Sequence, residues 1–513
     1  MTKQQLRLRY SGFIVFSVQI FSLITGLIFT LLLTRNMTTP QYGIWTNIFD
    51  YVGYFTIFSG MLPFWTIRFV ARGKEGTVRT STLAQLAIAL ASMIMYFPAI
   101  VLISRAIGTT NYLPIYLIAG SYIITAHLIV LFESILQSTR PQAVGYGLLI
   151  EEIVKVSVAL VLILGFHELF LGAVLGLVLS CFVQVFYYVY LLRHRFREKV
   201  HWGLLKEWLK GSTVILYNIV GTQLMAFALI LLFLYGSSDA RAYYQAALSF
   251  ATIVGYASSL SFTLYPKLLA KTCSDEQVGL SFQTVMMLAI PFSALIMVMS
   301  FSFLTVLNTT YGVAWPVLVA LTIDALVSLL ITFYNNCLMG AEHFDAEGKI
   351  SIRQLLKSKI FKVFSVPYVQ AAVALPLIYF VLTTLPLGGA VQAALYVITI
   401  LIGVHLSSFV GLYLFMRRSV KLPVAWKNIV KYVLASAAMA AVLFLVPTTT
   451  TLLSTIAKAI VGFLIYVGLL LVIDSQARHL IGLIWDEIKG SLQMLTSKNS
   501  SDSSEDDIVA SEN

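Results

Sequence analysis

Charged residues and cysteines are scarce in this 513-residue chain, and each shortage excludes a class of protein. Only 11% of the residues are charged and 59% are hydrophobic, which is more apolar side chain than one soluble core can bury. The three cysteines, Cys181, Cys273 and Cys337, lack the paired spacing of disulfide frameworks and zinc sites, so we interpret them as packing residues. The sequence therefore predicts an all-α membrane protein without a metal or other cofactor.

A signal-peptide pattern is also missing from the first residues. Lys3, Arg7 and Arg9 precede an apolar run that is too long for a signal-peptide core, and no small-residue cleavage site follows it. We expect this first apolar segment to be retained as a helix.

Apolar segments long enough to cross about 30 Å of hydrocarbon, roughly 20 residues each, occur fourteen times. They lie near residues 11–34, 42–67, 81–104, 112–136, 142–166, 168–192, 211–235, 242–266, 281–307, 313–338, 363–385, 390–416, 429–447 and 453–473. The predicted fold is a polytopic membrane protein with about 14 transmembrane helices.

Positive charge is distributed unevenly over the connections between these spans. With both termini in the cytoplasm, 29 of the 34 Lys and Arg residues fall on the inner side. Arg35, Arg105 and Arg241 fall in or beside outer loops, and Lys155 and Lys458 fall within spans. Topology thus explains the net charge of +11, and nucleic-acid binding loses its main support. We expect a plasma-membrane protein with cytoplasmic N- and C-termini.

The longest inner connections divide the chain into segments, since one of them follows the sixth span, where a two-lobed transporter would join its halves. The predicted segments are an N-terminal lobe at 1–192, a cytoplasmic linker at 193–210, a C-terminal lobe at 211–416, an extra helix pair at 417–473, an amphipathic cytoplasmic segment at 474–497 and a disordered acidic tail at 498–513.

A short repeat supports the division into two lobes. Tyr42 is followed after nine residues by Val52-Gly53-Tyr54, and Tyr244 is followed after nine residues by Val254-Gly255-Tyr256. Both copies lie where an outer loop enters a span. Four matched positions can arise by chance in a Tyr-rich chain, so the repeat gains its weight from its agreement with the topology.

Three motifs in the first 200 residues resemble a known family. The first is Arg35 followed by a short loop and Tyr42-Gly43, and the second is a glycine turn that leads to Arg68-Phe69-Val70-Ala71-Arg72. The third, a looser match, is Leu136-Gln137-Ser138-Thr139-Arg140 before a polar span. These motifs are similar to signatures of the polysaccharide-biosynthesis flippases of the multidrug/oligosaccharidyl-lipid/polysaccharide (MOP) superfamily. In the second half of the chain, only the helix count and the inner-loop pattern support the resemblance.

The resemblance implies two six-helix lobes around a central cavity, with an extra helix pair at the C-terminus. It implies a flippase, not an enzyme, that carries a polyisoprenyl-(di)phosphate-linked oligosaccharide from the cytoplasmic to the outer leaflet by alternating access. The product would serve surface polysaccharide or glycoprotein glycan assembly. The expected partners are this lipid-linked oligosaccharide, membrane lipids, and glycosyltransferases or glycan-assembly proteins.

Ionisable residues inside spans are costly and are functional candidates by default. Phosphate oxygens are best held by Arg or Lys, so the candidates for substrate binding are Arg35, Arg68, Arg140 and Lys155. Snorkelling at the interface is the competing interpretation for Arg35 and Arg68, a topological role for Arg140, and an internal ion pair with Glu151 for Lys155.

Four carboxylates are candidates for coupling transport to H⁺ or Na⁺: Asp50, Glu151, Glu152 and Asp324. The competing interpretation is polar packing between helices for Asp50 and Asp324, and an internal ion pair with Lys155 for Glu151 and Glu152. His405 also lies within a span and could titrate near neutral pH, although lone histidines more often bond to a neighbouring helix.

Three other functions remain open at this stage. One is a non-transporting scaffold for a glycan-assembly complex, which would leave the charges inside the spans unexplained. A cation-coupled exporter of small molecules belongs to the same superfamily but usually has twelve spans. A membrane glycosyltransferase or polymerase needs acidic motifs on a sizeable outer loop. Here the outer connections are only about 3–8 residues long and contain no Asp-x-Asp pair, which argues against that enzyme class.

Overall fold

The computed structural model describes residues 3–261, 275–341, 359–416, 425–474 and 478, and these residues form helices and no strands. Among the described residues, ten helices are long and apolar enough to cross a membrane, and each coincides with a predicted span. The described residues of the other four predicted spans also form helices, but these helices are shorter, broken or more polar. The all-α membrane fold is thus confirmed, while the number fourteen stays a prediction.

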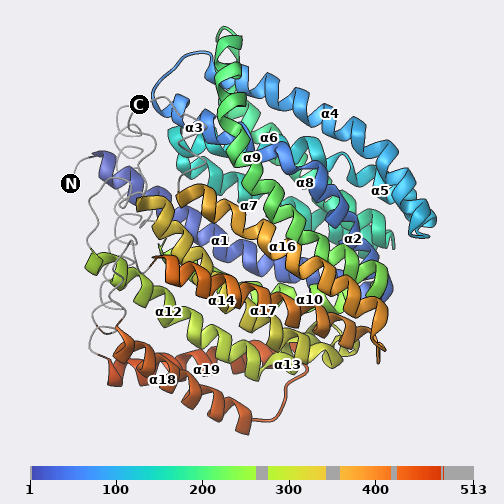
Figure 1. The fold of residues 1–513 in the computed structure, drawn as a ribbon, viewed down its shortest axis with the longest axis vertical. Helices are drawn as coiled ribbons and strands as arrows, with labels where there is room; N and C mark the ends of the chain where they lie inside the picture. The colour runs from blue at the N-terminus through green and yellow to red at the C-terminus, as the bar shows by residue number, and fades with distance from the viewer. Residues whose placement is uncertain (1–2, 262–274, 342–358, 417–424, 475–477, 479–513) are drawn as a thin grey trace, which may run out of the picture.

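The N-terminal helices pack mainly on one another, with α7 against both α8 and α1, and α6 against α3, α4 and α8. We call them the N-terminal group: α1 (Lys3–Asn36), α2 (Thr39–Phe55), α3 (Pro63–Ala71), α4 (Thr77–Ala106), α5 (Leu113–Ala119), α6 (Tyr122–Thr139), α7 (Pro141–Leu160) and α8 (Leu169–Leu192). Figure 1 shows this group in the upper part of the molecule.

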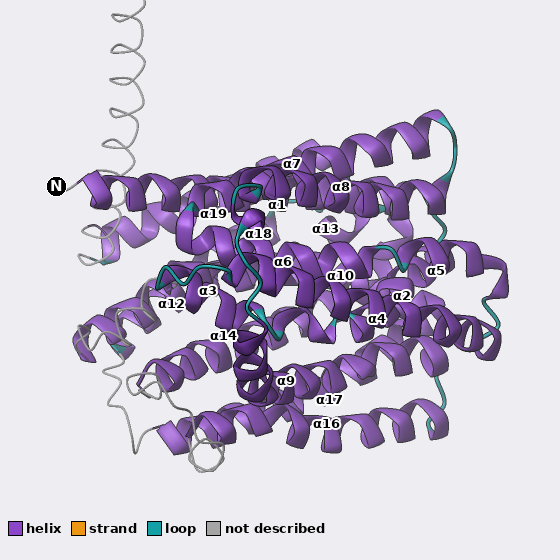
Figure 2. Ribbon diagram, turned by 90° about the horizontal axis from the view of Figure 1, so that it is seen from above, coloured by secondary structure: helices purple, strands orange, loops and turns teal. Residues whose placement is uncertain are grey.

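The later helices pack into a second body in which α14 contacts both α17 and α10. We call them the C-terminal group: α10 (Ser238–Gly255), α12 (Asp275–Val298), α13 (Ser300–Leu307), α14 (Trp315–Ala341), α16 (Lys359–Thr384) and α17 (Ala390–Met416). The helix α9 (Trp202–Leu231) packs extensively on α16 and also touches α2 and α4, so it joins the two groups. Figure 2 shows most of the long helices running roughly side by side across the view.

Two further helices, α18 (Trp426–Leu445) and α19 (Leu452–Ile473), pack on each other and on α12. They lie along the edge of the C-terminal group in Figure 1. Tyr466 of α19 donates a hydrogen bond to the carbonyl of Met287, which fixes the pair to α12 at a buried point. The predicted amphipathic segment 474–497 lies outside the described residues except for Asp474 and Arg478, as does the predicted disordered tail at 498–513.

The predicted span 42–67 is interrupted in the structure. Helix α2 ends at Phe55, a 3₁₀ turn (η1) covers Ile57–Gly60, and Pro63 starts α3. Proline is well suited to the first turn of a helix because its missing N–H has no intrahelical partner there. Helix α10, the second copy of the repeat, is likewise followed by a 3₁₀ turn at Tyr256–Ser261 (η6). Both copies of the repeat thus share a helix that ends in a tight turn.

The two repeat helices also pack against each other, so α2 and α10 form a main contact between the N- and C-terminal groups. Gly43 makes this contact close, because a Cβ there would clash with the backbone of Ser238. Helix α2 begins where the side chain of Gln41 accepts a bond of 2.9 Å from the N–H of Thr38. We call this region, between the end of α1 at Asn36 and the start of α2 at Thr39, the α1–α2 end of the bundle.

Candidate functional site

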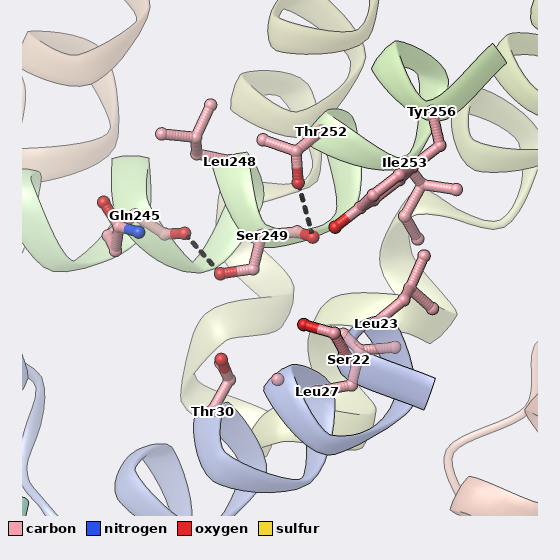
Figure 3. Close-up of a pocket in the computed structure, with 11 residues that line it drawn as sticks. Ser22, Leu23, Leu27, Thr30, Gln245, Leu248, Ser249, Thr252, Ile253 and Tyr256 are labelled. Carbon is pink, nitrogen blue, oxygen red and sulfur yellow. Dashed lines mark hydrogen bonds between the residues drawn. The ribbon is translucent and has the colours of Figure 1, made fainter. Parts of the chain in front are cut away.

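A cavity of about 250 Å³ lies between α1 and α10, where the N-terminal group meets the C-terminal group. Its walls come from one face of each helix, and Figure 3 shows the two sets of side chains facing one another. The lining residues are Ser22, Leu23, Gly26, Leu27 and Thr30 of α1, Gln245, Leu248, Ser249, Thr252 and Ile253 of α10, and Tyr256 of η6.

The lining is polar but uncharged. Hydroxyl groups and one amide alternate with leucine and isoleucine, and none of the lining residues carries a charge. The Ser249 and Thr252 hydroxyls donate to the carbonyls of Gln245 and Ser249, at 3.0 and 3.1 Å, so their oxygens still have acceptor capacity (Figure 3). Apolar walls with a few placed polar groups are typical of small-molecule sites, and this set suits a hydroxyl-rich ligand.

A buried charge cluster lies behind the α1 wall of the cavity. Lys155 of α7 contacts Glu152 at 2.8 Å and Glu151 at 3.4 Å, and the three side chains are at most 14% exposed. Glu152 in turn accepts hydrogen bonds of 2.6 Å from Ser22 and Thr25 of α1. Ser22 therefore belongs both to the cavity wall and to this cluster. The three candidates predicted from the polar fifth span are thus brought together one layer behind the cavity.

A second buried charge pair lies beside the cavity, toward the α1–α2 end. Arg241 of α10 donates two hydrogen bonds to the carboxylate of Asp50 of α2, at 2.8 and 2.9 Å. Its third bond, of 3.0 Å, goes to the side chain of Gln245, which lines the cavity. The Arg241 side chain is only 3% exposed. The candidate Asp50 therefore lies at the contact between the two helix groups and already has a full positive charge beside it.

The candidate Arg35 lies at the α1–α2 end itself. Its guanidinium donates a bond of 2.8 Å to the carbonyl of Val306 in α13, and the residue is exposed. Asn308 returns the contact by donating to the carbonyl of Thr34 at 3.2 Å. These two bonds join the end of α1 to the C-terminal group, so Arg35 participates in closing this end and lies outside the cavity lining.

The two remaining basic candidates do not line the cavity. Arg68 of α3 lies over the ring of Phe64, with its guanidinium carbon 3.9 Å from the ring centroid. Arg140 is exposed in the connection between α6 and α7. The structure therefore does not gather Arg35, Arg68, Arg140 and Lys155 into one cationic site.

The candidate Asp324 of α14 pairs with a histidine. Its Oδ1 lies 2.7 Å from Nδ1 of His405 of α17, and the two side chains are 14% and 19% exposed. Three helices converge here, because α10 packs on both α14 and α17. Asp324 is thus the one carboxylate among the four coupling candidates that is held by a titratable neighbour and not by a Lys or Arg.

Sequence reasoning missed two buried ionisable residues. Glu133 of α6 accepts hydrogen bonds of 3.2 Å from Gln184 and from Tyr188, and its place inside a span was a sufficient signal. Arg241 was expected in or beside an outer loop, because the apolar run begins after it. Helix α10 begins at Ser238, where the Ser237 side chain accepts from the N–H of Ala240, so Arg241 lies in the first turn of the helix.

The part of the chain that the structure describes contains no group of three or more His, Cys, Asp and Glu side chains placed to hold an ion. The site consists of a neutral polar cavity, a contact between the helix groups at one end of it, and three sets of largely buried charges around it.

Comparison with known proteins identifies the architecture. No family model and no curated protein sequence matches the chain. Among solved structures, the lipid II flippase MurJ in an inward closed conformation is similar with a TM-score of 0.65, at 16% identity, over 91% of this chain and 99% of that one. An inward-facing multidrug-resistance MATE transporter of the MOP superfamily has a TM-score of 0.60, at 12% identity, over 79% of this chain and 98% of that one.

A MOP-superfamily transporter from Pyrococcus furiosus is also similar, with a TM-score of 0.54 at 12% identity over 80% of this chain and 95% of that one. All of these identities are low, so the likeness concerns the fold. Together with the helix groups and the cavity between them, it leads to one conclusion: the chain has the transporter fold of the MOP superfamily.

Proposed function

We propose that this protein is a flippase that moves a polyisoprenyl-(di)phosphate-linked oligosaccharide from the cytoplasmic to the outer leaflet of the plasma membrane. The observation that carries the proposal is the uncharged cavity between α1 and α10, lined by hydroxyls and an amide and closed at the α1–α2 end. A sugar can exchange hydrogen bonds with such a lining, and its lipid tail can remain in the bilayer beside the helices.

Alternating access follows from the position of the closed contact. The Asp50–Arg241 pair and the close approach of Gly43 to Ser238 hold α2 against α10, so these contacts have to separate before the cavity can open toward the α1–α2 end. The cavity of about 250 Å³ is at the small end of ligand sites, so a glycan would enter only as α1 and α10 move apart.

Structural coverage favours a flippase over a small-molecule exporter. MurJ is similar over 91% of this chain and the MATE transporter over 79%, although both are matched over nearly their full length. The difference, 12% of 513 residues, is about 60 residues, which is the size of the predicted extra pair at 417–473. A cation-coupled exporter of small molecules is the second candidate, because several MATE structures share the fold.

Reconstitution in liposomes tests the proposal. A fluorescent lipid-linked oligosaccharide is incorporated into both leaflets, and a membrane-impermeant reductant is added outside. Protein-free liposomes should lose half of the fluorescence, whereas liposomes with the protein should lose nearly all of it. If half of the signal survives in both, the flippase proposal is wrong. Export of a cationic dye without any flipping would favour the second candidate.

A matched pair of substitutions connects the activity to the cavity. Ser249→Leu fills the cavity, and we expect it to slow flipping by about tenfold, which corresponds to roughly 1.4 kcal/mol in the free-energy barrier of transport. Ser407→Leu in α17 is the control, because this exposed serine makes the same hydrogen bond to the carbonyl four residues earlier but does not line the cavity. Equal slowing by both would show that the cavity is not the route.

A further inference from the structure

The partners of the four candidate coupling carboxylates distinguish one of them from the others. Asp50 is paired with Arg241, and Glu151 and Glu152 share Lys155. Lys and Arg keep their charge across the physiological pH range, so Asp50 has a permanent counter-charge of its own, and Glu151 and Glu152 share one. The partner of Asp324 is His405, whose side-chain type is the one that changes charge between about pH 5 and 8.

The geometry of the Asp324–His405 pair leaves a place for one proton. An ionised carboxylate can only accept a hydrogen bond, so the 2.7 Å contact requires the Nδ1–H of His405 to donate to Oδ1 of Asp324. This fixes the tautomer and leaves Nε2 of the neutral ring with a free lone pair. A proton that binds Nε2 converts the pair from a net charge of −1 to a net charge of zero.

We propose that the Asp324–His405 pair is the proton-binding site that couples transport to a transmembrane pH gradient. The inference rests on the proposed flippase function and names its coupling ion. Protonation stabilises a paired imidazolium and carboxylate, and loss of the proton leaves one uncompensated negative charge between α14 and α17.

Ionisable groups also lie on the elements around the pair. Helix α10 packs on both helices of the pair and carries the buried Tyr244. Two short turns also pack against the pair of helices, η5 (Leu232–Gly236) and η7 (Thr309–Ala314). On α14 and α17 themselves, the other ionisable residues with described side chains are Tyr334, Cys337, Tyr396 and Tyr413. On the elements packed against them, they are Asp239, Arg241 and Tyr243 of α10, Lys362, Tyr368 and Tyr379 of α16, Tyr235 of η5, Tyr256 of η6 and Tyr311 of η7.

Helix α10 connects the proton site to the contact between the helix groups. It packs on both α14 and α17, which carry the pair, and its Arg241 binds Asp50 of α2. In a low-dielectric interior a change of one unit charge is felt strongly by groups a few ångströms away. The charge of the pair therefore changes beside the helix that also forms the contact with α2.

Sodium fits this pair poorly. One carboxylate oxygen is already bonded to a ring nitrogen, and hard cations prefer several oxygen ligands at once. The described residues also hold no cluster of three or more His, Cys, Asp and Glu side chains at this place.

The test measures the leaflet distribution of a trace of fluorescent lipid-linked oligosaccharide in proteoliposomes under a pH difference of one unit. For one proton per lipid, the leaflet ratio at steady state should shift from one to about ten, because a pH unit equals about 1.4 kcal/mol. His405→Gln and Asp324→Asn should both hold the ratio at one. His127→Gln is the control, since His127 lies in a predicted span but bonds to the carbonyl of Ile123 and to no carboxylate, and it should keep the shift.

Failure of this inference can be distinguished from failure of the function. If the wild-type protein does not flip the lipid, the proposed function is wrong. If the wild-type protein flips the lipid but the leaflet ratio stays at one under the pH difference, or follows a sodium gradient instead, the proposed proton site is wrong. It is also wrong if the ratio still shifts in both His405→Gln and Asp324→Asn. If the His405 variant fails to fold, the result for Asp324→Asn alone tests the proton site.

Discussion

Helix α10 contacts the N-terminal group differently along its two halves. Near the α1–α2 end, Arg241 forms a bidentate pair with Asp50, and Gly43 brings the backbones of α2 and α10 close together. Farther along, α10 faces α1 across the neutral cavity, and the nearest charges lie behind α1 in the Glu152–Lys155 cluster. The closed half is held by direct contacts that are costly to break, whereas the open half presents side chains that can exchange partners with a ligand. The same helix can thus act as a closed contact and as a binding wall.

The largest effect is expected behind the open half, at Lys155. Lys155→Met leaves Glu151 and Glu152 buried without a positive charge, which should lower the free energy of unfolding by about 3–5 kcal/mol. Thermal unfolding of the purified protein in detergent measures this loss, with Lys155→Arg as the variant that keeps the charge. Equal stability of the methionine and arginine variants would show that the positive charge of Lys155 does not stabilise the cluster behind α1.

The closed half can be broken at Arg241. Arg241→Met leaves the carboxylate of Asp50 without its partner, with an expected cost of about 2–5 kcal/mol. Adding Asp50→Asn to this variant should recover part of the loss, because the uncompensated charge is then removed. Unfolding of the two single variants and the double variant gives the coupling energy, and strictly additive losses would contradict a direct pair.

Adding a methyl group should have different effects in the closed half and in the open half. Gly43→Ala places a Cβ against the backbone of Ser238, and we expect a cost of about 1–3 kcal/mol from overpacking. Gly26→Ala, which adds the same group to the cavity wall where nothing lies within 4 Å, should have no such cost. Thermal unfolding of both variants measures the difference, and a tolerated Gly43→Ala would mean that the closed contact yields easily.

The smallest effect is expected at Thr25, which links the cavity helix to the cluster. Thr25→Val keeps the shape of the side chain but removes the hydroxyl that donates to Glu152, at an expected cost of about 0.5–1.5 kcal/mol. Thr34→Val on the same helix is the control, because the Thr34 hydroxyl bonds only within α1. Equal losses for both variants would indicate that the bond to Glu152 contributes nothing beyond the helix itself.

Much of the fold could be predicted because a span depends on local composition. Ten predicted spans coincide with long apolar helices, and the i,i+4 spacing of Glu151 and Lys155 correctly indicated that they face one another. Arg241 was not among the candidates because hydropathy marks where a helix becomes apolar, while helix α10 begins at a serine cap before that point and so includes the arginine. The predicted cationic candidates were chosen by charge and resemblance, which carry no information on which helix face a residue occupies.

By itself, the sequence determined that the chain folds into membrane-spanning helices, because about 20 consecutive apolar residues have no other stable place than lipid or a buried core. Only the tertiary structure decided which charges meet. Asp50 and Arg241 are 191 residues apart, and Asp324 and His405 are 81 apart, so their pairing depends on how each helix is rotated and on which neighbour it packs against. Those choices follow from the summed contacts of many side chains, which no short stretch of sequence contains.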